Sequence, residues 1–235
     1  EAPAGVLTRA LVTTGNLAFF LAGARTASGY ALCRSDGTAS GSYELTGTDG
    51  VLSVWAGAPV IHSGIAYFSA WRADLGEELW RSDGTRAGTR PLGDLRPGTA
   101  GSLPRSLVST SRGLFFSARG PSGVETLWVT DGTVAGTVNL SAESQPQSLT
   151  AIGSGLLYSA WDATNGRELH HSDGTVAGSG LVVDTVAGPF GITIYQRPTS
   201  LGVGAVMAIS TSTSGIEPWY SDGTAAGTYM LADVR

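Results

Sequence analysis

The sequence contains no lysine, one cysteine and three histidines, and only 14% of its 235 residues are charged. Cys33 alone cannot form an intrachain disulfide, and so few Cys and His residues leave no set with the spacing of a zinc site. The formal net charge is -5 and the 14 arginines are scattered, so the basic surface typical of nucleic-acid binding is missing. We therefore predict no metal, no cofactor and no nucleic-acid partner.

Long apolar runs are also missing. The longest, Leu17–Ala24, is far shorter than the roughly 20 residues that a membrane helix needs, so we predict no membrane span. The hydrophobic fraction of 42%, together with the low charge, is nevertheless enough for a large core and argues against disorder. A chain of this length suits one all-β domain as well as two smaller domains.

What the sequence does contain is an internal repeat. Asp-Gly-Thr occurs five times, each copy preceded by Ser or Thr and followed, five residues after the Asp, by Gly-Thr or Gly-Ser. Successive aspartates are 47, 48, 42 and 49 residues apart, and 14 residues before each lies the small residue of an apolar run. The five aspartates are Asp36, Asp83, Asp131, Asp173 and Asp222. We predict repeats of about 47 residues at 6–46, 54–95, 104–142, 147–185 and 192–235.

Within each repeat the sequence pattern predicts strands only. The apolar runs are short, rich in aromatic and β-branched residues and bounded by Gly or Ser, and no window shows helical spacing. In the fourth repeat we expect strands at 148–152, 156–161, 168–172 and 178–184. Asp-Gly between strand residues is typical of a hairpin turn, so the tripeptide should join the third strand to the fourth.

Four antiparallel strands per repeat, used five times, fit a five-bladed β-propeller whose blades pack face to face. The rival is an open solenoid, which needs polar capping repeats, whereas the first and last repeats here are the most apolar. We predict an all-β fold in a single domain, residues 1–235, with the terminal blades meeting without strand exchange.

The third strand and its turn carry a family resemblance. Residues 78–85 read ELWRSDGT, residues 126–133 read TLWVTDGT and residues 217–224 read EPWYSDGT. This resembles the ELWxxDGT repeat family of bacterial proteins, in five in-register copies over essentially the whole chain, although residues 31–33 read ALC and residues 168–170 read ELH. The resemblance implies a secreted or cell-surface bacterial protein. The layout is also similar to the five-bladed tachylectin-type lectins, by analogy of shape alone.

Two recurrent residue types are better explained by structure than by binding. Each repeat offers a single Asp at the turn, whereas calcium needs six to eight oxygen ligands, so we predict that these aspartates stabilise turns. Trp80, Trp128 and Trp219 occupy the same place in three repeats and should pack as wedges between blades.

The sequence offers few residues that could act in catalysis. Glu168 and His170 point the same way on one strand, His171 points to the opposite face, and His62 lies far from the other two histidines in the sequence. No Gly-x-Ser-x-Gly elbow or His-Glu-x-x-His helix occurs. We predict that the chain is not an enzyme; a hydrolase or lyase is the third hypothesis.

The loop between strands two and three changes sequence while it keeps its length, as a recognition surface requires. The second and fourth copies begin with Trp, in the loops 71–77 and 161–167. An aromatic ring beside hydrogen-bonding groups suits a sugar, whose C–H face packs on the ring. The candidate ligand-binding residues are Trp71, Arg72, Asp74, Trp161, Asp162 and Asn165. The alternative is that both Trp side chains only cover the blade edge.

We therefore predict a binding module that recognises a small-molecule or glycan ligand, lectin-like, through one rim of the propeller. A protein-interaction scaffold with a protein partner is the second hypothesis.

Overall fold

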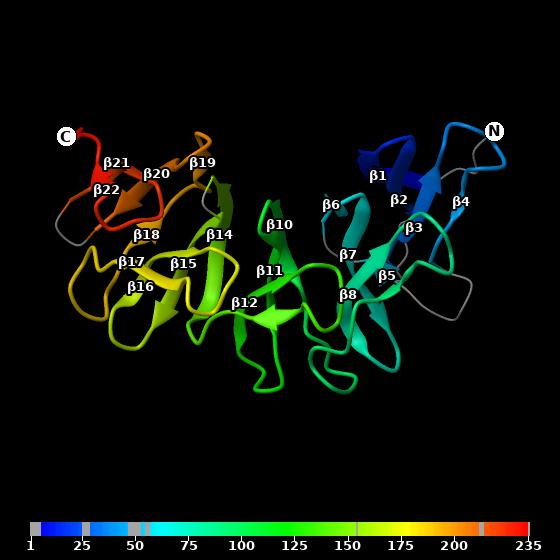
Figure 1. Ribbon diagram of the computed structural model, residues 1–235, viewed down its shortest axis with the longest axis horizontal. Coiled ribbons are helices and arrows are strands. Elements are labelled where there is room, and N and C mark those ends of the chain that lie inside the picture. Colours follow the sequence, from blue (N-terminus) through cyan, green and yellow to red (C-terminus); the bar gives the residue numbers. More distant parts are fainter. Residues whose placement is uncertain are drawn as a thin grey trace. The chain divides into compact units, whose positions relative to one another are not determined.

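The computed structural model describes residues 6–24, 29–46, 53–54, 57–153, 155–211 and 214–234. Every regular element in these ranges is a β-strand (Figure 1). Among the same residues no helix is long and apolar enough to cross a membrane. The chain divides into two compact units, which are described separately. Unit 1 is Glu1–Arg105, Arg119–Gly123 and Gly132–Val134, and unit 2 is Ser106–Ala118, Val124–Asp131 and Ala135–Arg235.

Unit 1 contains two sheets. Sheet 1 has the order β1-β2-β3-β4, and sheet 2 has the order β5-β7-β8-β9 with β6 also paired to β7. Their bounds are β1 Val6–Thr14, β2 Leu17–Ala24, β3 Ala31–Ser35, β4 Tyr43–Glu44, β5 Ser53–Val54, β6 Val60–His62, β7 Ile65–Arg72, β8 Gly76–Ser82 and β9 Arg90–Pro91.

Unit 2 holds sheets 3, 4 and 5, with the orders β10-β11-β12-β13, β14-β15-β16-β17 and β18-β20-β21-β22, where β19 also pairs with β20. Their bounds are β10 Arg105–Thr110, β11 Gly113–Arg119, β12 Glu125–Thr130, β13 Val138–Asn139, β14 Ser144–Ile152, β15 Gly155–Asp162, β16 Gly166–Ser172, β17 Ser179–Val183, β18 Thr193–Ile194, β19 Thr199–Ser200, β20 Ala205–Ser210, β21 Ile216–Ser221 and β22 Thr228–Met230. The first residue of β10, Arg105, is assigned to unit 1.

The all-β prediction is confirmed, and each repeat forms its own sheet from one continuous stretch of chain. In sheet 4 the four observed strands overlap the four expected ones. Sheets 2 and 5 differ because their first strand is split into two short pieces, β5 with β6 and β18 with β19. Closure into a five-bladed ring stays a prediction.

Apolar clusters join neighbouring sheets inside each unit. In unit 1, Phe19 and Leu32 of sheet 1 pack with Phe68 and Trp80 of sheet 2, and Trp80 is only 4% exposed. In unit 2, one cluster joins sheets 3 and 4 and another joins sheets 4 and 5. These faces bury both sides of the central strands, which is why their sequences are apolar without alternation.

The repeated tripeptide forms a hydrogen-bonded turn, seen here in sheet 4. Asp173 Oδ1 accepts bonds from the amide (2.9 Å) and the hydroxyl (2.7 Å) of Thr175. The same hydroxyl oxygen accepts a bond from the amide of Gly178 at 2.9 Å. The hydroxyls of Ser172 and Ser179, one on each side of the turn, lie 2.6 Å apart. The same Asp-to-Thr bonds occur at Asp36, Asp83 and Asp222.

The glycine of the tripeptide also touches the neighbouring sheet. Gly174 has a φ of 91°, a conformation that Gly adopts without steric cost, and a Cβ there would lie 3.4 Å from Arg112 of sheet 3. A Cβ at Gly84 would lie 2.7 Å from Leu17 of sheet 1, and one at Gly223 would lie 2.6 Å from His171 of sheet 4. Each of these turns therefore packs on the sheet before it.

One sequence expectation about sheet 1 is wrong. Ala22 and Ser69 each lie 14 residues before a turn Asp, so the sequence predicts that they occupy equivalent places. Ser69, however, pairs with Leu79, four residues before its turn Asp, whereas Ala22 pairs with Ala31, five residues before its own. The true counterpart is Leu21, which pairs with Leu32. The strand is shifted by one residue relative to the other repeats, and a one-residue slip exchanges the two faces of a strand.

The first residue of the ELW motif is a buried anchor for the connection to the next sheet. The carboxylate of Glu168 is fully buried and accepts hydrogen bonds from the amides of Thr185 and Val186, each at 3.2 Å. In sheet 2, Glu78 accepts bonds from the amide of Ser102 at 2.9 Å and from its hydroxyl at 2.6 Å. Burial raises the pKa of both carboxyls, and the hydrogen bonds oppose that shift.

Candidate functional site

Two turns of the same geometry present the candidate residues. Both are shorter than the predicted loops 71–77 and 161–167, because the strands extend to Arg72 and Asp162 and begin again at Gly76 and Gly166, so that Trp71 and Trp161 are strand residues. Arg72 pairs with Gly76 across the β7–β8 turn, and Asp162 pairs with Gly166 across the β15–β16 turn. The two glycines have φ of 73° and 72°. A Cβ at Gly76 would lie 2.5 Å from the carbonyl oxygen of Thr99, and one at Gly166 would lie 2.5 Å from that of Pro189. Each loop is therefore packed against the long connection that follows its sheet.

In unit 1 the end of β7 carries an exposed indole, and the residue that follows it, Arg72, forms an ion pair. Trp71 is 43% exposed. Arg72 binds Asp74 with two hydrogen bonds, Nε to Oδ1 at 2.5 Å and a terminal nitrogen to Oδ2 at 3.0 Å. This bond lowers the pKa of Asp74, and the guanidinium carbon of Arg72 lies 5.6 Å from the ring centroid of Trp80. Arg72 and Asp74 thus form an ion pair that lies against the buried indole of Trp80, on the opposite face of β7 from the side chain of Trp71.

In unit 2 the matching loop holds an exposed indole beside a capped turn. Trp161 is 42% exposed. Asp162 Oδ1 accepts bonds from the amides of Thr164 (2.7 Å) and Asn165 (2.8 Å), and Oδ2 accepts one from the side-chain amide of Asn165 at 3.1 Å. The amide of Asn165 is the largest cause of the lowered pKa of Asp162. Asp162 therefore stabilises its own turn first, a role that the sequence prediction did not give it.

The six predicted residues thus form two groups. Trp71, Arg72 and Asp74 lie together in unit 1, and the other three lie together in unit 2. Each group is treated as a separate candidate site.

Sequence reasoning missed the charged partner opposite each exposed Trp. Trp71 pairs across the strands with Glu77, and Trp161 pairs with Arg167. Glu77 is 7% exposed and binds the guanidinium of Arg105 through both oxygens, at 2.5 and 3.0 Å. Arg167 donates to the carbonyl of Gln145 at 3.0 Å, and burial lowers its pKa. Both lie six residues before the turn Asp, a repeat position that an offset comparison would have found.

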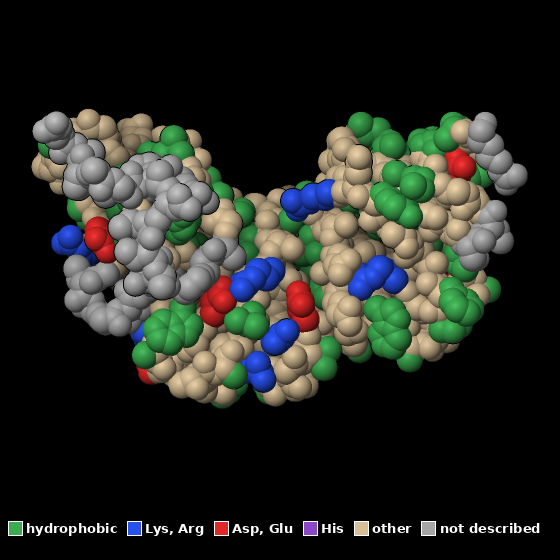
Figure 2. Space-filling view, turned by 180° about the vertical axis from the view of Figure 1, so that it is seen from behind, with side chains coloured by type: hydrophobic (Ala, Val, Ile, Leu, Met, Phe, Trp, Pro, Cys, Tyr) green, Lys and Arg blue, Asp and Glu red, His purple; other side chains and the backbone are tan. Residues whose placement is uncertain are grey.

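Two further residues considered in the sequence analysis lie in the core of sheet 4 and not at a site. Glu168 and His170 are fully buried, so neither side chain faces solvent. Within the described ranges no three His, Cys, Asp or Glu residues gather as a metal site. On the face shown in Figure 2, arginines and acidic residues are interspersed and no large patch of one sign is seen.

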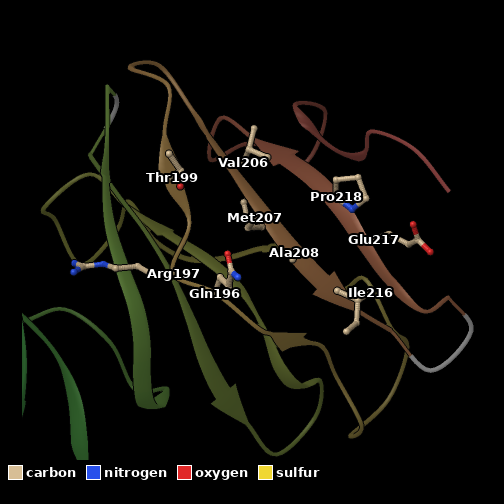
Figure 3. A pocket seen from close by; sticks show the side chains of 9 residues that line it. All are labelled: Gln196, Arg197, Thr199, Val206, Met207, Ala208, Ile216, Glu217 and Pro218. Atoms are coloured by element: carbon tan, nitrogen blue, oxygen red, sulfur yellow. The ribbon is translucent and has the colours of Figure 1, made fainter. Parts of the chain in front are cut away.

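A pocket of about 340 Å³ lies in sheet 5 (Figure 3). Its wall of β20 and β21 includes Val206, Ala208 and Pro218, and Gln196 approaches from the segment between β18 and β19. Arg197 points away from β20 and bonds the carbonyl of Leu149. The counterparts of Pro218 in the other sheets, all Leu, are fully buried. The face of sheet 5 that carries Pro218 is therefore only half-buried, unlike the same face of the other sheets.

Comparison with known proteins identifies the fold. No protein-family model matches the chain, and no curated protein matches it significantly by sequence. A puromycin-hydrolyzing peptidase of Mycobacterium tuberculosis matches with a TM-score of 0.58 at 14% identity, over 98% of this chain and 39% of that one. A puromycin hydrolase matches with a TM-score of 0.57 at 18% identity, over 96% of this chain and 39% of that one.

A putative TolB from Agrobacterium tumefaciens matches with a TM-score of 0.50 at 12% identity, over 97% of this chain and 81% of that one. The chain thus spans 39% of the length of the two hydrolases. At these identities the likeness shows the fold alone, a β-propeller scaffold, here built from sheets of four or five strands.

Proposed function

We propose that this chain is a lectin-like binding module of a secreted or surface-displayed bacterial protein. It binds a carbohydrate through the rim loops that carry Trp71 and Trp161. In this proposal the module has no catalytic role of its own, and each loop is a site in its own right, so up to two ligands bind per chain.

The observation that carries the proposal is the contrast between two classes of Trp. Trp80 and Trp128 are 4% and 8% exposed, whereas Trp71 and Trp161 are 43% and 42% exposed. An exposed indole at the end of a paired strand offers the apolar face of a sugar a surface that needs little further ordering.

The neighbouring polar groups are held in place before any ligand arrives. The Arg72–Asp74 pair and the Asp162–Asn165 pair each hold hydrogen-bonding groups in the turn that directly follows an exposed Trp. Fixed groups lose little conformational entropy when they bond a hydroxyl, which favours binding. The exposed ion pair itself contributes little to stability, so its position favours a role in recognition.

A glycan array tests the proposal. The wild-type chain should bind a defined set of glycans, and Trp71→Ala or Trp161→Ala should weaken binding by about tenfold or more, as expected for a stacking aromatic. Val176→Ala is the control, because Val176 is 60% exposed in the turn between β16 and β17, at the other end of β16 from the β15–β16 turn. An array without binding, or binding unchanged in both Trp variants, would contradict the proposal.

A protein-interaction scaffold is the second candidate, favoured by sheet 5. Several apolar side chains there are at least 48% exposed, namely Leu201, Val203, Ile216, Tyr229, Leu231 and Val234. Exposed apolar surface of this kind is typical of contact with another protein. This candidate would be favoured if the glycan array shows no binding and a purified partner protein binds the wild-type chain but not Tyr229→Asp.

We also propose that the five sheets are the blades of one closed five-bladed propeller. The half-buried Val206, Ala208 and Pro218 of sheet 5 support this, because the Leu counterparts of Pro218 in the other sheets are fully buried. A closed ring predicts one cooperative unfolding transition with equal calorimetric and van't Hoff enthalpies. Two separate transitions would contradict it.

A further inference from the structure

Sheet 4 carries a polar pair where other sheets carry an apolar one. Tyr158 of β15 and His170 of β16 are direct cross-strand partners. The corresponding pairs in sheets 2 and 5 are Phe68–Trp80 and Met207–Trp219. Sheet 4 therefore has a His at the position of Trp80 and Trp219, and a Tyr at the position of Phe68 and Met207.

Both side chains are fully buried, and each has a polar atom with no hydrogen-bond partner among the described protein groups. These atoms are the hydroxyl oxygen of Tyr158 and Nε2 of His170. The two ring centroids are 5.4 Å apart, with an angle of 34° between the planes. Tyr158 belongs to a core cluster of apolar side chains, among them Phe115, Leu127 and Leu149, and the Glu143 carboxylate is, after burial, the second cause of its raised pKa. Buried polar atoms are normally bonded to protein or to ordered water, so this pair requires an explanation.

The hydrogen bond on the other ring nitrogen fixes what Nε2 can do. Nδ1 of His170 lies 3.0 Å from the carbonyl oxygen of Glu168. A carbonyl can only accept, so Nδ1 carries the hydrogen and Nε2 of the neutral ring is an acceptor. The hydroxyl of Tyr158 is free to donate. A molecule that satisfies both must donate to one atom and accept from the other, and water does both.

We propose that Tyr158 and His170 bind an internal water molecule in sheet 4. The water donates a hydrogen bond to Nε2 of His170 and accepts one from the hydroxyl of Tyr158. The imidazole is smaller than the indole that occupies this place in sheets 2 and 5. Globular proteins hold on the order of one buried water per 27 residues, usually on polar groups that lack protein partners. This site is independent of the proposed carbohydrate function.

A double-mutant cycle on the full chain tests the proposal. With a shared water, Tyr158→Phe or His170→Phe alone leaves a buried partner unsatisfied and lowers the folding equilibrium constant. The double variant Tyr158→Phe/His170→Phe loses less than the sum of the two, with a coupling of about fivefold, typical of residues in one network. Tyr195→Phe, at a side chain that is 56% exposed, is the control for the substitution itself. Single variants that are neutral or stabilising, with additive effects, would overturn the proposal.

A crystal structure of the wild-type chain provides the second measurement and needs no variant to fold. It should show one density peak within hydrogen-bond distance of both atoms. A direct bond from the Tyr158 hydroxyl to Nε2, or no peak at all, would overturn the water site.

Discussion

The carboxylate of Asp173 lies against the backbone of Gly178, so closely that a Cβ at Gly178 would be 2.1 Å from Oδ1. The same overlap, between 1.9 and 2.3 Å, recurs in the other four repeats. The second glycine of the repeated motif is therefore needed because any side chain there would collide with the turn aspartate.

Gly178→Ala should destabilise the chain by about 1–3 kcal/mol, the usual cost of overpacking. The reason is the collision with Asp173, which must leave its bonds to Thr175. Gly180→Ala is a matched control two residues away, because a Cβ there meets nothing within 4 Å. Urea unfolding of the two variants measures the difference. Equal stability in the two variants would refute this account of the turn.

The turn hydrogen bonds predict the titration of Asp173. The hydroxyl and then the amide of Thr175 lower the pKa of Asp173 below its ordinary value of 3.8. The contribution of this lowered pKa to stability is present above pH 3.8 and is lost as the pH falls through the folded value. Thr175→Val should raise the pKa of Asp173, followed by NMR of its carboxyl carbon, and should leave that of Asp222 unchanged. A pKa of Asp173 unaffected by the substitution would contradict the assignment.

Glu168 should be needed to hold the connection after β17. Glu168→Ala leaves the amides of Thr185 and Val186 without their acceptor and should cost about 1.5–3 kcal/mol, as for hydrogen bonds to a charged group. Glu168→Gln keeps one acceptor oxygen and should cost less. Chemical unfolding gives both values, and amide hydrogen exchange should rise at Thr185 and Val186 in the Ala variant. An Ala variant as stable as the wild type would show that the anchor is dispensable.

His170 should make the chain less stable in mild acid. Burial lowers its pKa below 6.5, although the hydrogen bond to the Glu168 carbonyl and the charges of Glu143 and Asp162 oppose this, and Arg167 adds to it. The unfolded chain then binds the proton at a higher pH than the folded chain. The free energy of unfolding is therefore unaffected by His170 above pH 6.5 and decreases as the pH falls below 6.5 towards the folded pKa. The loss of stability between about pH 7.5 and about pH 5 should be smaller in His170→Phe. An unchanged pH dependence would exclude His170 as its source.

Much of the fold could be predicted from the sequence because the decisive signals are local. Asp-Gly flanked by strand residues defines a hairpin by backbone chemistry alone, and β16 and β17 meet there as expected. The one-residue shift that replaces Ala22 by Leu21 was not predictable, because it depends on how strands pair and not on where the apolar run lies. The division of the first strand into two pieces in sheets 2 and 5 also depends on strand pairing and was therefore not predictable.

The candidate site was predictable only in part. The exposure of Trp71 and Trp161 follows from their place at the ends of β7 and β15. Side-chain pairing depends on rotamers and on contacts across strands, so the sequence could not show that Asp162 caps its own turn or that Glu77 binds Arg105. The Tyr158–His170 pair of sheet 4 was not predictable for the same reason, because it depends on the register between β15 and β16.

The most direct test of the carbohydrate proposal follows the indole N–H signals of the six Trp residues by NMR while a glycan from the array is added. The account predicts that the signals of Trp71 and Trp161 shift and saturate, while those of the buried Trp80 and Trp128 stay in place. Shifts confined to the buried indoles, or no shift with any glycan, would contradict it.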